Sequence, residues 1–447
     1  MGILKACGGH GDGTELDQVL ATIDPRLCVS CKGARMLCGY DPCPLLQKIR
    51  SQMPKVVREG GHLGRDVFGS SPPSLFVGRH GYPNVAIGPM LPPEHREADA
   101  ARRLDSPAEW LGMTIPDIVG LRSSLLRTTH KVAVRDVARL AGDVFSPDRI
   151  TRLSQELALA ARPIDTEVHL AKAPRFGAPT VGDFAPPHGP SAEVERATLA
   201  ENVRVERPLE RAAGDTDLRA GEAIAGLYAG GTSVYQLERV LSAGLLGLGQ
   251  NRKLVPTRWA ITATDDQVGK ALIEKVRDLP TIDKPILHVG ERFGNRFFAL
   301  LLPRVWGFES IEAWLKGSFW ASSGMPLAEG ASGIVEADWE DHAGRTTYAA
   351  TAGGYYATRL AVLEHMIATG RQATAIVLRE ITDDYTTPLG VWVVREVSRL
   401  TMAARPLVFE DVESALRHID RHCQFKTWQA HADLLARCRL QRTLESY

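Results

Sequence analysis

The sequence lacks the features that would attract it as a whole to a charged or apolar partner. Lys plus Arg and Asp plus Glu each total 53 residues, so the formal net charge is zero and no global field draws the chain to DNA or to an anionic membrane. No run of about 18 apolar residues occurs, and the first residues lack the apolar segment of a secretory signal. We therefore expect a soluble, cytoplasmic protein, in which any contact with nucleic acid comes from a local basic patch.

The common catalytic motifs are also missing. The chain contains no G-x-x-x-x-G-K-[ST], G-x-G-x-x-G, H-E-x-x-H or G-x-S-x-G, which removes the usual nucleotide-hydrolase, Rossmann, zinc-protease and serine-hydrolase interpretations. Two acidic clusters, "DWEDH" at 338–342 and "REITDD" at 379–384, are compatible with a carboxylate-bound magnesium ion, or with two solvated loops at strand ends. The catalytic residues stay unknown, and enzymatic activity stays open.

Length and composition set the scale of the fold. A chain of 447 residues is longer than one hydrophobic core usually serves, and 44% hydrophobic residues supply ample core. We expect an N-terminal region over residues 1–53, a large main body over 54–430 and a C-terminal tail over 431–447.

Cysteine is scarce, but four of the seven cysteines lie in one short segment, "LCVSCKGARMLCGYDPCP". Their spacing is C-x2-C-x6-C-x4-C, and glycines follow the second and third cysteines where the chain must turn back. Four thiolates close a tetrahedral shell and leave no place for a substrate, so the segment predicts a structural zinc site (Zn2+). A redox C-x-x-C pair and an iron–sulfur cluster are the alternatives. The predicted ligands are Cys28, Cys31, Cys38 and Cys43.

The last seven residues, "QRTLESY", have the Q-x-x-L-x-x-aromatic layout of a motif that binds the PCNA sliding clamp. On one helical turn Leu444 and Tyr447 would share a side and enter a hydrophobic groove, with Gln441 hydrogen-bonding at its edge. The alternative is the plain end of an amphipathic helix whose leucines face the core.

Two stretches of the body carry basic residues at turns. Residues 75–78 and 85–87 read as strands joined by a turn, with Arg79 and His80 at the strand end, where they would receive a phosphate or form an ordinary hairpin surface. Residues 232–278 read as a helix, a Gly-rich turn, a basic segment, a strand over 257–264 and a second helix, an order typical of a winged-helix-like unit. In that unit the phosphate contacts would be Arg252, Lys253 and Arg258, although the leucines of the segment would equally line a core.

The last third of the chain mixes helices and strands. A hairpin turning at 290–295, a strand beginning near 333, a helix from 354 to 370 and apolar strands at 374–381 and 389–397 are expected. Without a regular alternation of strand and helix, this pattern favours an α+β fold with a mixed-sheet main body.

Several segments together resemble the archaeal Nre family of DNA repair proteins. They are "CVSCKGARMLCGYDPCP", "FVGRHGYPNVAIGPM", "RKLVPTRWAIT", "GGYYATRLAVLE" and the terminal "QRTLESY", and they extend along nearly the whole chain. The resemblance implies a zinc-finger module, a role in repairing DNA damage and docking on the PCNA clamp, but it supplies no reaction. Tyr447 is the only aromatic residue of the tail motif.

The leading hypothesis is a DNA repair protein whose tail tethers it to the clamp, which raises its effective concentration on DNA without tight DNA affinity of its own. The alternative is an enzyme of nucleic-acid or nucleotide metabolism acting on a phosphate-bearing substrate, with magnesium where the acidic clusters bind it. The candidate phosphate-binding or nucleic-acid-binding residues are Arg79, His80, Arg252, Lys253, Arg258 and Arg379.

Overall fold

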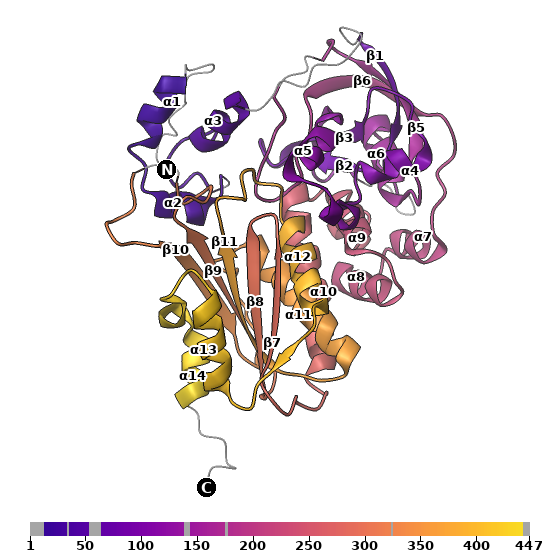
Figure 1. Cartoon of the computed structure of the whole chain (residues 1–447). Coiled ribbons are helices and arrows are strands. Elements are labelled where there is room, and N and C mark those ends of the chain that lie inside the picture. Colours follow the sequence, from indigo (N-terminus) through magenta and orange to yellow (C-terminus); the bar gives the residue numbers. More distant parts are fainter. Residues whose placement is uncertain are drawn as a thin grey trace. The chain divides into compact units, whose positions relative to one another are not determined.

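The computed structural model (Figure 1) describes residues 13–33, 35–52, 64–137, 144–174, 178–322 and 325–440. The chain divides into two compact units, here called the terminal unit (Met1–Gln52 with Gly269–Tyr447) and the central unit (Met53–Val268). The region predicted over 1–53 therefore belongs, up to Gln52, with the last third of the chain.

The central unit is built on a six-stranded sheet in the order β1-β5-β6-β4-β3-β2. β4 and β6 pair in parallel and the other neighbours pair antiparallel, so the sheet is mixed. The strands are β1 (Asp66–Ser71), β2 (Leu75–Val77), β3 (Asn84–Leu91), β4 (Leu126–Ala133), β5 (Ile164–Leu170) and β6 (Ser191–Leu199). The helical elements are α4 (Ala98–Arg103), η1 (Pro107–Gly112), α5 (Ile115–Ser123), α6 (Arg149–Leu159), α7 (Arg207–Gly214), α8 (Ala220–Ala229), α9 (Val234–Ser242), η2 (Gly249–Asn251) and α10 (Thr257–Val276), which continues into the terminal unit.

Helix α6 packs on this sheet, and its sequence explains how. Asp148 caps α6 by accepting a hydrogen bond from the Thr151 backbone N–H at 2.8 Å. The buried side of α6 supplies Ile150 to a cluster with apolar strand residues, and supplies Leu153 and Leu157 to a second cluster. The helix is thereby fixed against the sheet by its apolar face.

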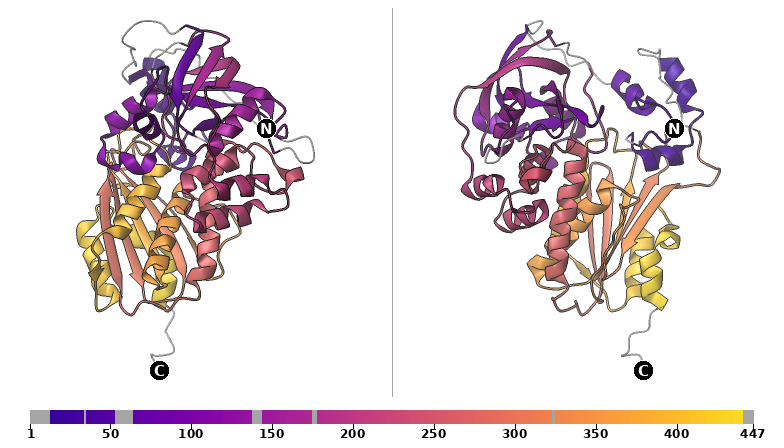
Figure 2. Two further views of the ribbon diagram at one scale, coloured as in Figure 1. Left: turned by 90° about the vertical axis from the view of Figure 1, so that its right-hand side faces the viewer. Right: turned by 180° about the vertical axis from the view of Figure 1, so that it is seen from behind.

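The terminal unit holds a second mixed six-stranded sheet, in the order β10-β9-β11-β8-β7-β12. Within this unit Figures 1 and 2 show α11 and α12 on one face of the sheet and α13 and α14 on the other. The strands are β7 (Ile286–Arg292), β8 (Asn295–Leu302), β9 (Gly307–Leu315), β10 (Gly333–Glu340), β11 (Thr374–Ile381) and β12 (Leu407–Val408). The helical elements are α1 (Gly13–Leu20), α2 (Pro25–Cys31), α3 (Pro44–Gln52), α11 (Gly353–Thr369), α12 (Trp392–Ala403), α13 (Val412–His422), η3 (Trp428–His431) and α14 (Asp433–Leu440).

Burial on both faces explains the sequence of the central strands. β9 and β11 are buried at every position, and neither shows the alternation of apolar and polar residues that a half-exposed strand has. Their buried polar residues include three glutamates and one arginine. Glu309 on β9 accepts hydrogen bonds from the backbone N–H groups of Leu434 and Leu435 at the start of α14, and burial raises the pKa of this carboxyl to about 7. Such carboxylates hold the C-terminal helices on the sheet.

The α+β prediction is confirmed, and so are the hairpin of β7 and β8, the strands β10 and β11, and the helix α11. Two strand predictions are wrong. Residues 257–264 form the first half of α10, so the winged-helix-like segment 232–278 holds α9, η2 and α10 and, in a stretch that is described throughout, no strand. Residues 389–397 lead into α12 instead of forming a strand.

The structure shows the reason in each case. Along α10 the buried side chains follow one another at intervals of four, the spacing of a helix face: Ala260, Thr264, Val268, Leu272 and Val276. Val393, Val397 and Thr401 do the same along α12. The β-branched residues that suggested strands are thus placed by tertiary packing, which overrides their weak intrinsic preference. Among the described helices, none combines the length and the apolar character that crossing a bilayer requires.

Candidate nucleic-acid interface

In the central unit, two segments far apart in the sequence meet where β2 ends and α10 begins. The Val77 backbone N–H donates to Oγ1 of Thr257, the first residue of α10, at 2.9 Å. Beyond this bond the rings of Tyr82, in the β2–β3 turn, and Trp259 lie 5.3 Å apart between centroids at a 59° angle. Each of these two side chains is 44% exposed. The contact therefore presents two adjoining aromatic rings to solvent.

The turn that carries Tyr82 requires a glycine. Gly81 has φ +81°, and a Cβ at this position would lie 2.8 Å from the Asn84 carbonyl oxygen. A side chain would thus be strained by both the backbone conformation and the contact. Arg79 is half-buried and His80 is exposed at the start of this turn, as the sequence predicted for the strand end.

Arg127 on β4 places a positive charge beside the β2–β3 turn. Its guanidinium carbon lies 3.8 Å from the ring centroid of Phe76 on β2, and a Cβ on Gly78 would lie 3.0 Å from its Nη2 atom, so the glycine allows this approach. The Nε atom of Arg127 is sealed from solvent and has no hydrogen-bond partner. Burial lowers the pKa of Arg127 to about 10. Within the described ranges no carboxylate pairs with this guanidinium, and the Phe76 ring is the contact that its charge makes there.

Two further cations surround this position. The Arg258 guanidinium carbon lies 4.0 Å from the ring centroid of Phe184, and Lys253 is exposed on the segment leading into α10. Of the predicted candidates, Arg79, His80 and Arg258 thus lie on the two segments that the Val77–Thr257 bond joins. Sequence reasoning missed Arg127, Tyr82 and Trp259. We call this group, Arg79, His80, Tyr82, Arg127, Arg258 and Trp259, the aromatic–arginine surface.

The sequence did contain a signal for this surface. The three segments that build it lie in stretches without a single Asp or Glu: residues 67–93, 118–135 and 239–264. In a chain with equal numbers of acids and bases, these stretches are locally basic, which the net charge conceals. The absence of acids was visible in the sequence, but the convergence was not.

Arg252 and Arg379 have other roles than the predicted phosphate contacts. Arg252 is 6% exposed, and its guanidinium donates to the backbone carbonyls of Gly247, Ala213 and Asp215. Arg379 on β11 is 4% exposed and donates to the Glu312 carboxylate and to the Asn295 side chain. Both guanidiniums are committed to contacts inside their units, where a phosphate has no access.

The cysteine segment lies in the terminal unit. Cys28 and Cys31 are buried in the last turn of α2, whose cap residue Lys32 has φ 48°, and the glycine after it has φ 66°. The Arg35 backbone N–H points at the Cys31 sulfur at 3.3 Å. Burial raises the pKa of the Cys43 thiol to about 12, and the proximity of Cys31 and Cys28 adds to this rise. In the part of the chain that the structure describes, no group of three or more His, Cys, Asp or Glu side chains has an arrangement that holds a metal ion.

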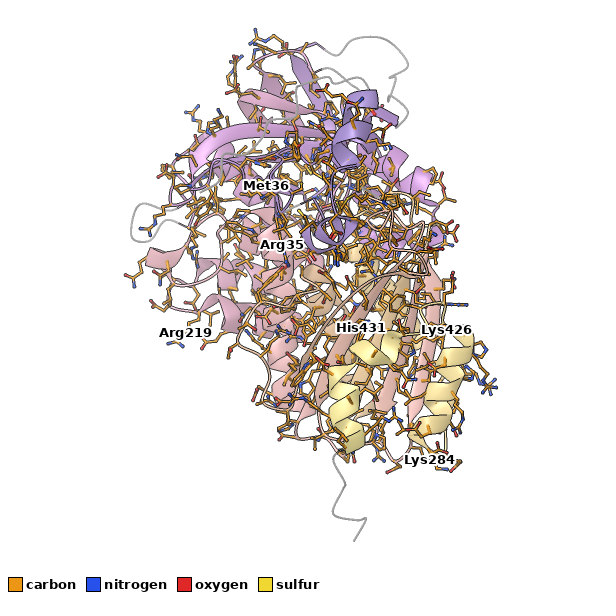
Figure 3. All side chains as sticks on the ribbon, turned by 90° about the vertical axis from the view of Figure 1, so that its left-hand side faces the viewer. Arg35, Met36, Arg219, Lys284, Lys426 and His431 are labelled. Atoms are coloured by element: carbon orange, nitrogen blue, oxygen red, sulfur yellow. The ribbon has the colours of Figure 1, made fainter. Side chains whose placement is uncertain are left out.

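A buried ion pair fixes this segment to the sheet. Lys32 Nζ lies 2.6 Å from Glu312 Oε2 on β9, and both side chains are less than 5% exposed. On the other side the Arg379 guanidinium lies 2.7 Å from Glu312 Oε1. Arg35, labelled in Figure 3, donates to the Ala350 carbonyl. The loop between the second and third cysteines is therefore anchored to the terminal unit by charge and by hydrogen bonds.

Asp338, Glu340 and Glu380 of the acidic clusters make internal contacts, whereas Asp341, Asp383 and Asp384 are exposed. Asp338 accepts from the Arg345 guanidinium and from the Ala350 backbone N–H, and Glu340 pairs with Arg359 at 2.9 Å. Glu380 accepts from two backbone N–H groups after α13. These carboxylates organise strand ends and loops, and they do not converge on a shared ion among the described residues.

The predicted clamp motif, Gln441, Leu444 and Tyr447, lies outside the described residues. The described part before it ends with α14, in which Leu434, Leu435 and Cys438 are buried against the sheet. Lys426 and His431, labelled in Figure 3, lie in the connection between α13 and α14.

The fold and this surface define an α+β protein of two mixed sheets with a basic, aromatic patch of the kind that nucleic acids contact. Comparison with known proteins identifies its family. A family model described as "Archaeal Nre, N-terminal" matches residues 37–321 and one described as "Archaeal Nre, C-terminal" matches residues 340–447. The chain belongs to the archaeal Nre family.

Curated relatives agree with this assignment. The DNA repair protein NreB of Archaeoglobus fulgidus is 38% identical over 419 residues, which cover 93% of this chain and 98% of that protein. The DNA repair protein NreA of the same organism is 38% identical over 403 residues, covering 90% and 95%. NreA of Haloferax volcanii is 38% identical over 366 residues, covering 80% and 83%. No solved structure matches the chain.

Proposed function

We propose that this chain is a DNA repair protein that contacts DNA through the aromatic–arginine surface of its central unit. The observation that carries the proposal is Arg127, a cation held over the Phe76 ring with no carboxylate partner among the described residues, at the meeting point of three acid-free stretches. A desolvated guanidinium without an anion is costly, and a DNA phosphate supplies the missing charge. The names of the relatives support DNA repair as the setting.

The DNA contact is tested by fluorescence anisotropy with a labelled oligonucleotide. Binding should weaken steeply with salt, because each phosphate contact releases counterions. The double variant R79A/R258A should bind about tenfold to a hundredfold more weakly and show a shallower salt slope, by about one unit per lost contact. The matched control is R207A/R211A, which removes two exposed arginines of α7 in the same unit. An equal loss in the control variant, or no loss in either, contradicts the assignment of the surface.

A structural zinc ion in the cysteine segment is the second part of the proposal. Four thiols on a short segment are the donor set that Zn2+ prefers, and the Arg35 backbone N–H directed at the Cys31 sulfur is a contact that favours a thiolate. Cys28, Cys31, Cys38 and Cys43 would hold the ion and brace the loop on the sheet, with no role in a reaction.

Elemental analysis of the purified chain should find one equivalent of zinc. A strong chelator should remove it and lower the melting temperature, because metal binding and folding of such a module are coupled. The variant C43S should lose the zinc, whereas C423S, which changes a buried cysteine on the far side of the terminal sheet, should keep it. Iron in place of zinc, or zinc retained by C43S, contradicts this part of the proposal.

Docking on the PCNA clamp through Gln441, Leu444 and Tyr447 is the third part. The described chain ends on the short helix α14, whose last residue, Leu440, is 82% exposed, and the motif follows at once. A tether of this kind compensates for a neutral net charge by raising the local concentration at DNA.

The triple variant Q441A/L444A/Y447A should abolish co-purification with the clamp and leave the melting temperature within about 1 °C of the parent, if the motif serves the clamp and not the fold. The control is R442A/T443A/S446A, which changes the intervening positions of the same tail and should retain binding. Clamp binding that survives the first variant, or is lost in both, means that the motif is not the docking element.

A further inference from the structure

We propose that the aromatic–arginine surface takes an unpaired base of DNA, which stacks on the ring of Trp259 and contacts the inclined ring of Tyr82 while the arginines hold the neighbouring phosphates. This inference rests on the proposed DNA contact and goes beyond it by naming the substrate class: DNA in which a base has left the duplex stack, as in a single strand, a bulge or a damaged site.

The first argument is the kind of side chain that is exposed. Trp259 and Tyr82 are each 44% exposed and touch one another, whereas six of the other tryptophans, Trp110, Trp306, Trp314, Trp320, Trp392 and Trp428, are at most 2% exposed. A large ring exposed to water is unfavourable unless a partner covers it. Two such rings in contact, flanked by cations, form a stacking platform of the type that bases occupy.

The second argument is where the cations lie relative to the rings. Arg258 precedes Trp259 directly in the first turn of α10, and Arg79 lies three residues before Tyr82 in the same turn. Successive phosphates of a strand lie on either side of the base between them, so a base on the rings brings phosphates toward both arginines. Arg127 lies next to Gly78, beside the same turn, and adds a third positive charge.

The third argument concerns DNA itself. In an intact duplex the faces of the bases are covered by their neighbours, and a protein reaches only their edges and the backbone. A Trp or Tyr face can therefore stack only on a base that has left the helix, and unstacking costs least where the base is already unpaired or damaged. The rings thus favour unpaired DNA over intact duplex, whereas the arginines alone would bind both.

Backbone contacts fix the segments that carry Tyr82 and Trp259. The Val77–Thr257 hydrogen bond fixes the start of α10 to the strand before the turn, and the positive φ of Gly81 sets the turn. A platform positioned by backbone contacts loses little conformational entropy on binding.

The test uses three labelled probes with one sequence: a single strand, an intact duplex and the duplex with one unpaired base. We expect the full chain to bind the single strand and the bulged duplex about tenfold or more tightly than the intact duplex at the same salt concentration. Y82A and W259A should each reduce this preference by about tenfold, because they weaken binding of the single strand and the bulged duplex more than binding of the intact duplex, and W259F should restore most of it. Y348A removes another exposed ring, in the terminal unit, and should have no effect.

A spectroscopic readout separates stacking from a general loss of affinity. Stacking of a base on an indole quenches its fluorescence, and the difference in emission between the parent and W259F isolates Trp259. That difference should fall on addition of single-stranded DNA. If no probe binds at low salt, the proposed DNA contact itself is wrong. If all three probes bind equally and Trp259 emission does not change, the DNA contact stands and the inference of an unpaired base is overturned.

Discussion

The variant E312Q should lower the free energy of unfolding by about 3 to 5 kcal/mol, a loss typical of a broken buried ion pair. Glu312 lies between two buried cations, 2.6 Å from Lys32 Nζ and 2.7 Å from Arg379 Nη1. Glutamine keeps the shape of the side chain and one acceptor oxygen, but it leaves two positive charges facing each other in the interior. The loss should therefore exceed that of K32M, which leaves the Glu312–Arg379 pair neutral and intact. Urea unfolding of the three proteins measures this order.

The pH dependence provides a second measurement of the same carboxylate. Burial acts to raise the pKa of Glu312, but the charges of Lys32 and Arg379 outweigh it and hold that pKa below its ordinary value. The stabilisation is then fully present above the unfolded-state pKa of about 4.5 and is lost as the pH falls through the lower folded-state pKa. E312Q should lack this acid-dependent loss. D17N, which disrupts the surface pair of Asp17 with Lys48, should cost less than about 1 kcal/mol. A similar small cost for E312Q contradicts the prediction.

Four of the six strands of the terminal sheet could be predicted from the sequence, because turns bound them and β8 and β11 hold apolar runs, whereas β9 and β12 were not predicted. β7, β8, β10 and β11 appear where the patterns placed them. α10 and α12 were misread because Thr, Ile and Val favour strands locally, and only the intervals of four between their buried residues show a helix. The pairing of the N-terminal segment with the last third of the chain depends on Lys32 reaching Glu312, 280 residues away, and no local pattern contains that information.

The sequence indicated which segments form the proposed surface, but it did not indicate all of the residues in it. Arg79, His80 and Arg258 each follow or begin a regular element, and their phosphate contacts stay a prediction, whereas Arg252 is a basic residue that follows a turn. Inside the fold its guanidinium satisfies three backbone carbonyls. Arg127 reads as one polar residue of a strand in the sequence, and its lack of a counter-charge becomes visible only when Phe76 and Gly78 are seen around it.

The variant R127M should separate binding from stability. We expect DNA affinity to fall by about tenfold to a hundredfold, by a similar factor for different sequences, because a desolvated phosphate contact is lost. We expect the free energy of unfolding to stay equal or to rise by up to about 1 kcal/mol, because methionine keeps the apolar contact with the Phe76 ring and removes a cation that burial disfavours. Anisotropy with a labelled single strand and urea unfolding measure the two effects on one preparation.

Arg122 offers the control, since it is also an arginine over an aromatic ring, 5.6 Å from the centroid of Trp110, although it is buried and Arg127 is half-buried. Unlike Arg127 it has an anion, Asp105, at 2.8 Å, and it donates to the carbonyls of Leu104 and Pro187. R122M should therefore destabilise the chain by about 3 kcal/mol or more, because it leaves buried acceptors unpaired. Among the described residues, Arg122 thus has a carboxylate partner and Arg127 has none. A large loss of stability in R127M with unchanged DNA binding would mean that Arg127 stabilises the folded chain and does not bind a DNA phosphate.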